Sequence, residues 1–443
     1  MNISKIASST VIIETEDTKI LCDPWIENGE YYGSWSIVQE LFDKEKLYKK
    51  MNDCENIYFS HIHPDHFSKK TLKKIDKDKK VFLHKYASPF LKKNLEILGF
   101  TNINEIENGE SLKVKGNTNI TIFAADNCDP NICNKFVGCN YSEESKNSQQ
   151  IDSCAVISDK SSVCLNLNDC MQPMMKETIK NIKNKFKRVN ILLVNYNSAH
   201  SYPQNVKNIK DAEKIRIGNN IKQINLEKSI KYIEDLCPDF FIPFAGEYTL
   251  SGKKFLLNDF KGTNSQNDCY DFFMNTKYKN NLVMLNYGNS FDGNKIPVFE
   301  KIHQSDLLNY NKKLSELTYD YDLIEKPSKD EIEDLSNLAL INVMKKINFF
   351  KLKFNHVLYI QYYEKFIYLD FDNNYIKFVN EIISDNRSYT ILHLDEKLLI
   401  QLLKGPRFAH WNNADIGSHI DFTKSRIQDY DYKLFNCIAY FHS

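Results

Sequence analysis

The sequence has few arginines, few tryptophans and no long hydrophobic run. Its arginines are Arg188, Arg216, Arg387, Arg407 and Arg426. Lysine therefore supplies most of the positive charge, and lysine binds phosphate as a point charge without the planar fork of arginine. The 58 basic residues balance 58 acidic ones, so no nucleic-acid or membrane-surface partner is indicated. No apolar stretch approaches the length of a membrane-spanning helix.

The sequence also shows no pattern typical of a targeting segment or of a disulfide scaffold. Residues 1–5 lead straight into a strand-like run and contain no signal-peptide core. The 11 cysteines are odd in number and scattered, which fits a reducing compartment. We therefore expect a cytoplasmic protein. The 443 residues, 42% of them hydrophobic, allow two or three domains with sizeable cores.

The most informative feature is a cluster of three histidines and an aspartate at residues 61–66, HIHPDH. It follows an apolar run at residues 57–59 that predicts a short buried strand. Neutral imidazole suits zinc and iron, and a carboxylate adds a harder oxygen ligand. Extended backbone would point His61 and His63 the same way, while Asp65 and His66 follow the turn at Pro64. We predict that His61 and His63 bind one metal ion and that Asp65 and His66 bind a second. The alternative is a histidine-rich surface loop without a metal.

The HxHxDH pattern is the signature of the metallo-β-lactamase fold, and the flanking sequence resembles that fold. Two β-rich runs at residues 8–14 and 19–22 precede Asp23-Pro24, and we expect a helix over residues 35–51. The fold class implied is α+β. We expect an αββα sandwich over residues 1–300 that holds metals at one rim, followed by a smaller α+β C-terminal domain over residues 312–443.

A further carboxylate follows a predicted hairpin. Runs at residues 154–158 and 162–167 read as its two strands, and Asp169 comes directly after them. The resemblance to the fold implies that Asp169 bridges two metals; the alternative is a turn residue or a helix N-cap. We expect Asp65 and Asp169 to be the catalytic carboxylates.

Several sequence blocks narrow the resemblance to the CMP-N-acetylneuraminate hydroxylase family. In chain order they are DPW at 23–25, YFSHIHPDH at 58–66, TLKK at 71–74, DSC at 152–154, NDC at 168–170 and PFAG at 243–246. In the C-terminal region, IG at 416–417 and the aromatic-rich run at 432–441 also look similar. The resemblance implies oxygenation of an acyl-sugar group by a di-iron site.

The sequence departs from that family before the lactamase-like part. The family carries a Rieske iron–sulfur domain there, and a Rieske centre needs two Cys and two His ligands. This chain has no His before His61. We therefore expect the Rieske domain to be absent and the electrons to come from a separate donor protein.

The second departure is a missing metal ligand. The fold normally supplies another His after the strand predicted at residues 120–125, but residues 126–151 contain no His. Candidate ligands in this insert are Asp126, Cys128, Asp129, Cys133 and Cys139. This insert has three interpretations. Asp126, Cys128 or Asp129 replaces the missing His as a metal ligand, or Cys128, Cys133 and Cys139 hold a separate metal ion or cluster. In the third interpretation the cysteines are ordinary reduced residues on a polar loop.

Four residues elsewhere are further candidates. Glu247 lies at a strand end from which the fold often takes a last ligand, although a solvated loop carboxylate is the alternative. His200, Trp25 and Trp411 are candidates for the wall of a substrate pocket, and a packed side chain is the alternative for Trp411.

These features together predict a metalloenzyme with two divalent ions, either iron or zinc. By resemblance, it would be a di-iron hydroxylase or monooxygenase acting on a small nucleotide-activated or acylated sugar. One alternative is a hydrolase of an ester, amide or lactone, in which the ions lower the pKa of a bound water. Another is a non-catalytic ligand-binding member of the fold. We expect the C-terminal domain to shape the site or to form an interface.

Overall fold

Two mixed β-sheets form the centre of the molecule. The computed structural model describes residues 1–443 except 87, 126–151, 350, 384–385 and 428–431. Within these residues the first sheet has the order β15 (Ser290–Phe291), β1 (Asn2–Ala7), β2 (Thr10–Glu14), β3 (Lys19–Cys22), β5 (Asn56–Phe59), β6 (Lys80–His84) and β7 (Ile103–Ile106). The second has the order β13 (Phe240–Pro243), β12 (Ile191–Val194), β11 (Val163–Asn166), β10 (Ser153–Ser158), β9 (Thr118–Ala124) and β8 (Ser111–Lys115).

The two sheets pack face to face through one buried cluster. Alternate side chains of a strand point to the same face, and Val11 and Ile13 of β2 meet Ile120 and Ile122 of β9 in this way. A polar contact also spans the sheets, because the Tyr58 hydroxyl lies 3.0 Å from the Ser153 hydroxyl. This contact ties the strand before the histidine cluster to the start of β10.

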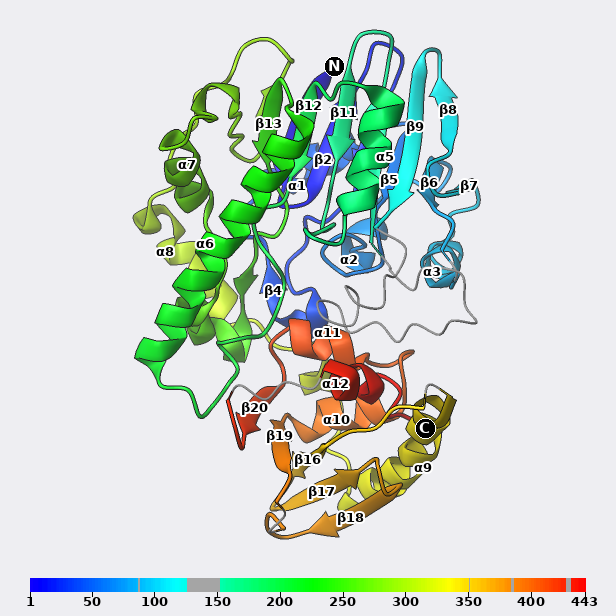
Figure 1. Cartoon of the computed structure of the whole chain (residues 1–443), viewed down its shortest axis with the longest axis vertical. Helices are drawn as coiled ribbons and strands as arrows, with labels where there is room; N and C mark the ends of the chain where they lie inside the picture. The colour runs from blue at the N-terminus through cyan, green and yellow to red at the C-terminus, as the bar shows by residue number, and fades with distance from the viewer. Residues whose placement is uncertain (87, 126–151, 350, 384–385, 428–431) are drawn as a thin grey trace.

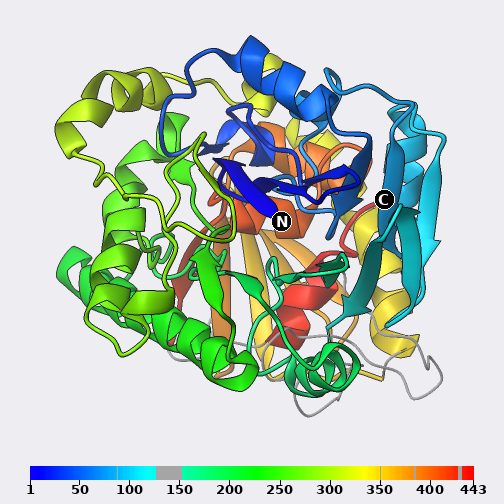
Figure 2. The ribbon, with the colours of Figure 1, turned by 90° about the horizontal axis from the view of Figure 1, so that it is seen from above.

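Helices cover both outer faces of the sandwich (Figures 1 and 2). The first sheet is covered by α1 (Lys44–Asn52), α2 (Lys69–Leu72) and α3 (Phe90–Ile97), and the second by α5 (Lys176–Phe186), α6 (Asp211–Leu236) and α7 (Gln266–Met274). Each outer layer buries an apolar stripe, as Met51 and Leu95 do on one side and Ile179 and Ile233 on the other. The predicted αββα architecture is confirmed.

Short elements lie around one rim of the sandwich. They are η1 (Tyr31–Gly33), η2 (Gly252–Phe260), α8 (Gln304–Ser315), η4 (Asp320–Leu323) and a ribbon of β4 (Trp35–Ser36) with β14 (Thr249–Leu250). A further short turn, η3 (Lys279–Asn281), lies instead beside the start of β13, where Asn281 donates to the Asp239 carbonyl. The helix predicted over residues 35–51 is therefore wrong in its first half. Trp35 instead stacks on Tyr248 with ring centroids 3.5 Å apart, and the helix begins after Asp43, whose carboxylate accepts from the Lys46 amide.

The C-terminal region has a hydrophobic core of its own, drawn from residues 319–441. Its elements are α9 (Lys329–Phe349), α10 (Glu396–Leu403), α11 (Trp411–Ile416), α12 (Tyr432–Ile438) and a sheet with the order β18 (Tyr375–Val379), β17 (Lys365–Asp370), β16 (His356–Tyr362), β19 (Ser388–His393) and β20 (Asp421–Lys424). This confirms an α+β C-terminal part; the domain boundaries at 300 and 312 stay a prediction. Of the helices described, none has both the length and the apolar character needed to cross a bilayer.

The C-terminal region contacts the rim of the sandwich, and Figure 1 shows α11 at the junction. The side-chain amide of Asn205 donates to the Ile420 carbonyl at 2.7 Å. The backbone N–H of Lys207 donates to the Phe422 carbonyl at 2.8 Å. The rim in contact is the one at which β3, β5 and β12 end.

Candidate metal centre

The imidazole rings of His61 and His66 are oriented by hydrogen bonds at their Nδ1 atoms. Asp23 follows β3, next to β5 in the sheet, and its Oδ2 accepts from the Ser60 hydroxyl at 2.6 Å and from His66 Nδ1 at 2.8 Å. Because Ser60 donates its proton to Asp23, its oxygen accepts from His61 Nδ1 at 2.9 Å. We infer that both rings carry their proton on Nδ1 and present the lone pair of Nε2 to the site.

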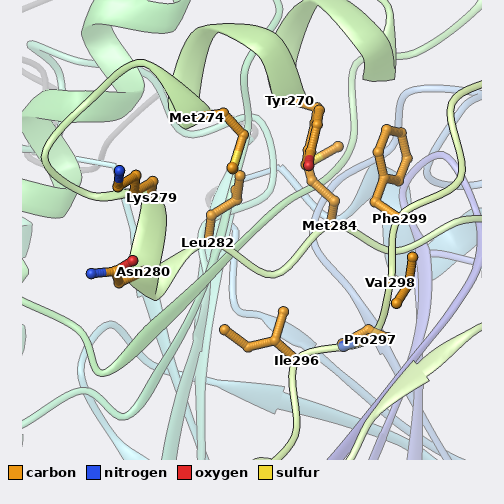
Figure 3. A pocket seen from close by; sticks show the side chains of 10 residues that line it. All are labelled: Tyr270, Met274, Lys279, Asn280, Leu282, Met284, Ile296, Pro297, Val298 and Phe299. Carbon is orange, nitrogen blue, oxygen red and sulfur yellow. The ribbon is translucent and has the colours of Figure 1, made fainter.

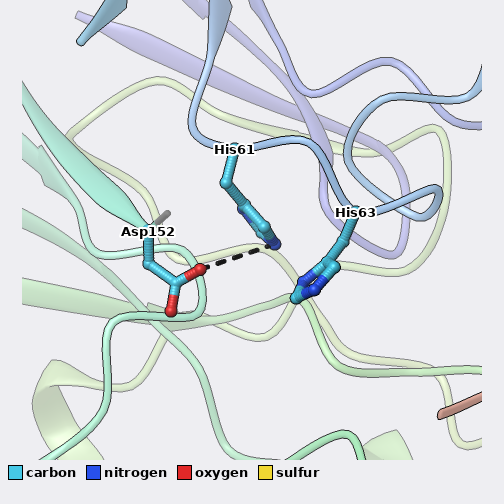
Figure 4. A group of neighbouring side chains, drawn as sticks. All are labelled: His61, His63 and Asp152. Atoms are coloured by element: carbon cyan, nitrogen blue, oxygen red, sulfur yellow. Dashed lines mark ion pairs between the residues drawn. The ribbon is translucent and has the colours of Figure 1, made fainter. Parts of the chain in front are cut away.

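Two groups of potential ligands share His61. The first consists of His61, His63 and Asp152, and the second of His61, His66 and Asp169. Within each group the ligand atoms lie within 4.8 Å of one another. Figure 4 shows His61 paired with Asp152 and His63 beside them. His61 Nε2 is 3.9 Å from Asp152 Oδ1 and also 3.9 Å from Asp169 Oδ2. The second oxygen of Asp169 is 3.3 Å from His66 Nε2, so this carboxylate spans both groups.

Asp65 lies beside the second group. Its Oδ2 is 3.5 Å from His66 Nε2, and its Oδ1 accepts from the Tyr31 hydroxyl at 2.7 Å. Burial and the Asp65 carboxylate raise the pKa of Tyr31 well above its ordinary value, so the phenol stays a donor. Thus Oδ1 of Asp65 is hydrogen-bonded to Tyr31, and Oδ2 faces His66.

Burial and mutual charge set the protonation of these groups. Burial, aided by His66 and His63, lowers the pKa of His61, and burial lowers the pKa of His63 to about 4. Burial acts to raise the pKa of Asp169, but the neighbouring His66 outweighs it and holds that pKa well below its usual range. Burial also raises the pKa of Asp152 to about 7. Neutral His61 and His63 beside the ionised Asp169 are in the protonation states that metal binding requires. His66 differs, because burial acts to lower its pKa but the carboxylates of Asp169, Asp65 and Asp23 outweigh burial and raise that pKa well above the ordinary value, so a metal ion would displace a proton there.

The residues present fit a metal ion. His61 Nε2, His66 Nε2 and Asp152 Oδ1 are buried without a hydrogen-bond partner, and such atoms are rare because each costs about 1–3 kcal/mol. Each of the three atoms lies near another member of its ligand group, with His61 Nε2 3.9 Å from Asp152 Oδ1 and His66 Nε2 3.3 Å from Asp169 Oδ1. In the described part of the chain both groups contain only imidazole and carboxylate donors, a set that suits iron or zinc.

The structure brings together most of the residues that the sequence singled out, and it adds one. His61, His63, His66 and Asp169 converge, and Asp65 lies alongside. Asp152 was not predicted as a ligand. Its signals were its place in the DSC block at 152–154, directly before a strand, and the missing His nearby. The insert candidates Asp126, Cys128, Asp129, Cys133 and Cys139 lie outside the described residues, so the three interpretations of the insert stay open.

Glu247 is a member of neither group. Its carboxylate lies 3.6 Å from Lys5 Nζ and accepts from Gln266 at 2.8 Å and from the Tyr287 hydroxyl at 3.1 Å. Glu247 is 3% exposed and Lys5 is fully buried. The structure therefore places this predicted ligand in a buried ion pair, where neighbouring side chains occupy its carboxylate.

Two predicted pocket residues are core residues instead. Trp25 is fully buried and donates its indole N–H to the Glu27 carbonyl at 2.8 Å. Trp411 is 2% exposed and donates to the Phe441 carbonyl at 2.9 Å. Both side chains are packed in the core, which is the alternative given for Trp411, and neither offers surface to a ligand in the structure. His200 is half-buried and belongs to neither ligand group.

A cavity of about 410 Å³ lies elsewhere in the molecule (Figure 3). Its lining residues are Tyr270, Met274, Lys279, Asn280, Leu282, Met284, Ile296, Pro297, Val298 and Phe299. Most of this wall is apolar, and it includes none of the residues of the two ligand groups. The cavity is therefore separate from the candidate metal centre.

The fold and the site define the class of protein: the chain contains a metallo-β-lactamase-fold domain with a cluster of histidines and aspartates that could hold metal ions. Residues 2–143 match the family model described as a beta-lactamase superfamily domain. This match supports the prediction of a metallo-β-lactamase-fold metalloenzyme.

Relatives of the expected kinds are found. A protein of Mycolicibacterium smegmatis named as a Rieske 2Fe-2S iron–sulfur protein is 27% identical over 253 residues, which are 56% of this chain and 43% of the relative. The cytidine monophosphate-N-acetylneuraminic acid hydroxylase of Sus scrofa is 23% identical over 279 residues, 61% of this chain and 55% of the relative. The suspected resemblance is thus confirmed, and the chain spans about half the length of these relatives.

Solved structures are similar at low identity. An isothiocyanate hydrolase from Delia radicum gut bacteria is 10% identical, has a TM-score of 0.43, and covers 66% of this chain and 98% of its own.

Proposed function

We propose that this chain is an iron-dependent hydroxylase. The observation that carries the proposal is the donor set of the first ligand group, which combines His61 and His63 with the Asp152 carboxylate. The second group shares His61, whose one free nitrogen can bind a single ion, and otherwise offers His66 and Asp169. Two histidines and a carboxylate that leave coordination positions open are typical of non-haem Fe(II) oxygenases. Asp152 supports iron over zinc here, since it supplies oxygen where the fold would otherwise supply a third imidazole for the first group.

The proposed substrate is a nucleotide-activated or acylated sugar. This proposal rests on the family resemblance and on the hydroxylase relatives, whose names state that chemistry for those proteins. Hydroxylation with dioxygen consumes two electrons besides those of the substrate. We propose that a separate electron-donor protein supplies them.

The site residues divide into a buried side and an open side. His61 and His66 are fully buried and Asp65 is 3% exposed, whereas Asp152 and Asp169 are each about a quarter exposed. When bound, the metal ions would supply dioxygen activation. Asp23 and Ser60 keep the two buried rings oriented, the packing behind them excludes water, and the substrate enters over Asp152 and Asp169.

Metal analysis of protein purified without oxygen tests the proposal. We expect about two irons per wild-type chain and less than a tenth of that in a His61→Ala, His66→Ala double variant. A His393→Ala, His442→Ala double variant is the matched control, because neither residue belongs to a ligand group. Equal metal content in all three proteins would contradict the metal centre.

Oxygen dependence then separates the two enzymatic alternatives. Iron content with oxygen consumption in the presence of a reductant supports the hydroxylase. Zinc content with turnover of an ester, amide or lactone under anaerobic conditions would support a hydrolase instead. Metal binding without turnover, together with thermal stabilisation by a nucleotide sugar, would indicate a binding protein.

A further inference from the structure

The turn η1 has a strained backbone. Tyr31 has φ 48° and Tyr32 has φ 60°, so two successive non-glycine residues occupy the left-handed region. Residues with a Cβ rarely adopt this conformation, and it persists only where the surrounding structure imposes it. The turn therefore depends on its contacts.

His419 of the C-terminal region holds the first residue of this turn. Its Nε2 lies 2.6 Å from the Tyr31 carbonyl oxygen, and its Nδ1 lies 3.0 Å from the Tyr321 hydroxyl. A carbonyl only accepts, so Nε2 carries the proton and Nδ1 accepts from Tyr321. His419 is 3% exposed, which means that water does not compete for these bonds.

The next two residues of the turn also contact the C-terminal region. The His410 amide donates to the Tyr32 hydroxyl at 2.7 Å. Gly33 has φ 104° and packs so closely on Tyr319 that a Cβ there would lie 2.9 Å from that ring. All three residues of η1 are thus fixed by residues that follow position 318.

The other end of Tyr31 reaches the candidate metal centre. Its hydroxyl donates to Asp65 Oδ1 at 2.7 Å, and Asp65 Oδ2 remains turned toward His66 Nε2 at 3.5 Å. Tyr31 is 2% exposed and packs on Trp35, with ring centroids 4.5 Å apart, so its hydroxyl has little freedom.

We propose that Tyr31 is a positioning residue for the second metal ion and that the C-terminal region controls that position through His419. The hydrogen bond from Tyr31 fixes which oxygen of Asp65 faces the ion, and His419 fixes Tyr31. The inference rests on the proposed metal centre. It assigns to the C-terminal region a direct effect on metal binding.

Cobalt titration of the metal-free full-length protein tests the proposal, with the visible absorption spectrum and calorimetry as readouts. In Tyr31→Phe we expect the second equivalent of Co²⁺ to bind about 10–100-fold more weakly and its spectrum to change, since loss of a partner of a metal ligand has that effect. The first equivalent stays unchanged. Tyr48→Phe is the matched control, because it removes another phenol that donates to a carboxylate, Glu27 at 2.7 Å.

The role of His419 is tested in the same assay. His419→Leu should weaken the second equivalent, and His419→Gln, which keeps a side-chain N–H donor, should restore part of the affinity. His393→Leu is the control, because His393 bonds to Gln361 and Thr423 and contacts no residue of η1. If His419→Leu fails to fold, His419→Gln still reports on His419, and Tyr31→Phe, which removes a single oxygen atom, still decides the positioning role of Tyr31.

The outcomes separate this inference from the proposed function. Two equivalents bound by Tyr31→Phe with wild-type affinity and spectrum overturn the positioning role and leave the metal centre intact. No cobalt bound by the wild type overturns the metal centre and this inference with it. A loss in Tyr31→Phe that Tyr48→Phe does not share supports the inference.

Discussion

The Asp23 carboxylate lies 2.8 Å from His66 Nδ1, on the side of the ring that faces away from the other ligands. Both side chains are fully buried. A carboxylate in this place fixes the tautomer and the orientation of a metal-binding imidazole and makes it a stronger donor. Asp23 belongs to the Asp-Pro pair that the sequence resemblance singled out, and this contact gives the pair a physical role.

Replacing Asp23 with Asn should weaken metal binding about 10–100-fold, the usual effect of losing a partner of a ligand. The amide keeps the size of the side chain but loses the charge that favours a proton on His66 Nδ1. Calorimetric metal titration measures the change. Asp370→Asn is the control, because Asp370 is a buried carboxylate that pairs with Arg387 far from the site. Equal losses in both variants would indicate a general stability effect.

Replacing Asp152 with His should change the metal preference. The first ligand group would then contain three imidazoles, and the Zn:Fe ratio after loading with equimolar metals should rise roughly tenfold. Metal content by elemental analysis measures the ratio. Asp53→His, which adds an imidazole to an exposed position, is the control. An unchanged ratio in Asp152→His would remove Asp152 from the ligand set.

The sequence predicted the candidate ligands that lie close together in the chain. His61, His63 and His66 fall within six residues, and their spacing after a strand is a local signal. Asp152 is different, because its position depends on the pairing of two strands. Ala124 pairs with Ser153 across the β9–β10 ladder, so Asp152 lies where the missing His was expected to follow β9. No local sequence pattern predicts how β9 and β10 are aligned in the sheet.

The errors in the fold have a similar cause. The pattern over residues 35–51 is amphipathic, but the stacking of Trp35 on Tyr248 overrides the helical preference of its first half. A second case is the apolar run at residues 282–288, whose pattern predicts a last strand of the first domain; in the structure it forms a single bridge, between Leu282 and Phe241. Its burial comes from packing under other segments and not from a ladder. Propensity is a weak guide wherever distant residues decide the environment.

His419 should make the folded state less stable at acidic pH. Burial lowers its pKa to about 4, whereas an unfolded His has its ordinary pKa near 6.5. Between these values the unfolded chain binds more protons, so stability falls as pH falls, by about 2 kcal/mol between pH 7 and pH 5. Urea unfolding of the metal-free protein at both pH values measures this. His419→Gln should show a smaller loss than the wild type; an equal loss would assign the effect to other groups.

The ion pair of Lys5 and Glu247 should matter for stability and not for metal binding. Both residues are buried, and Glu247→Gln leaves the Lys5 ammonium without its counter-charge, which costs about 3–5 kcal/mol. Burial already lowers the pKa of Lys5 and Glu247 opposes that effect, so the variant should lose less stability at pH 9, where Lys5 sheds its proton more readily. Denaturant unfolding at pH 7 and pH 9 measures the loss.

A Lys5→Met, Glu247→Met double variant is the control for this prediction. It removes both charges together, and apolar replacements for a buried pair are often neutral or stabilising, so it should recover most of the lost stability. Metal content should equal that of the wild type in both variants, because the Glu247 carboxylate is occupied by Lys5, Gln266 and Tyr287. Loss of one metal equivalent in Glu247→Gln at full folding would instead make Glu247 a ligand.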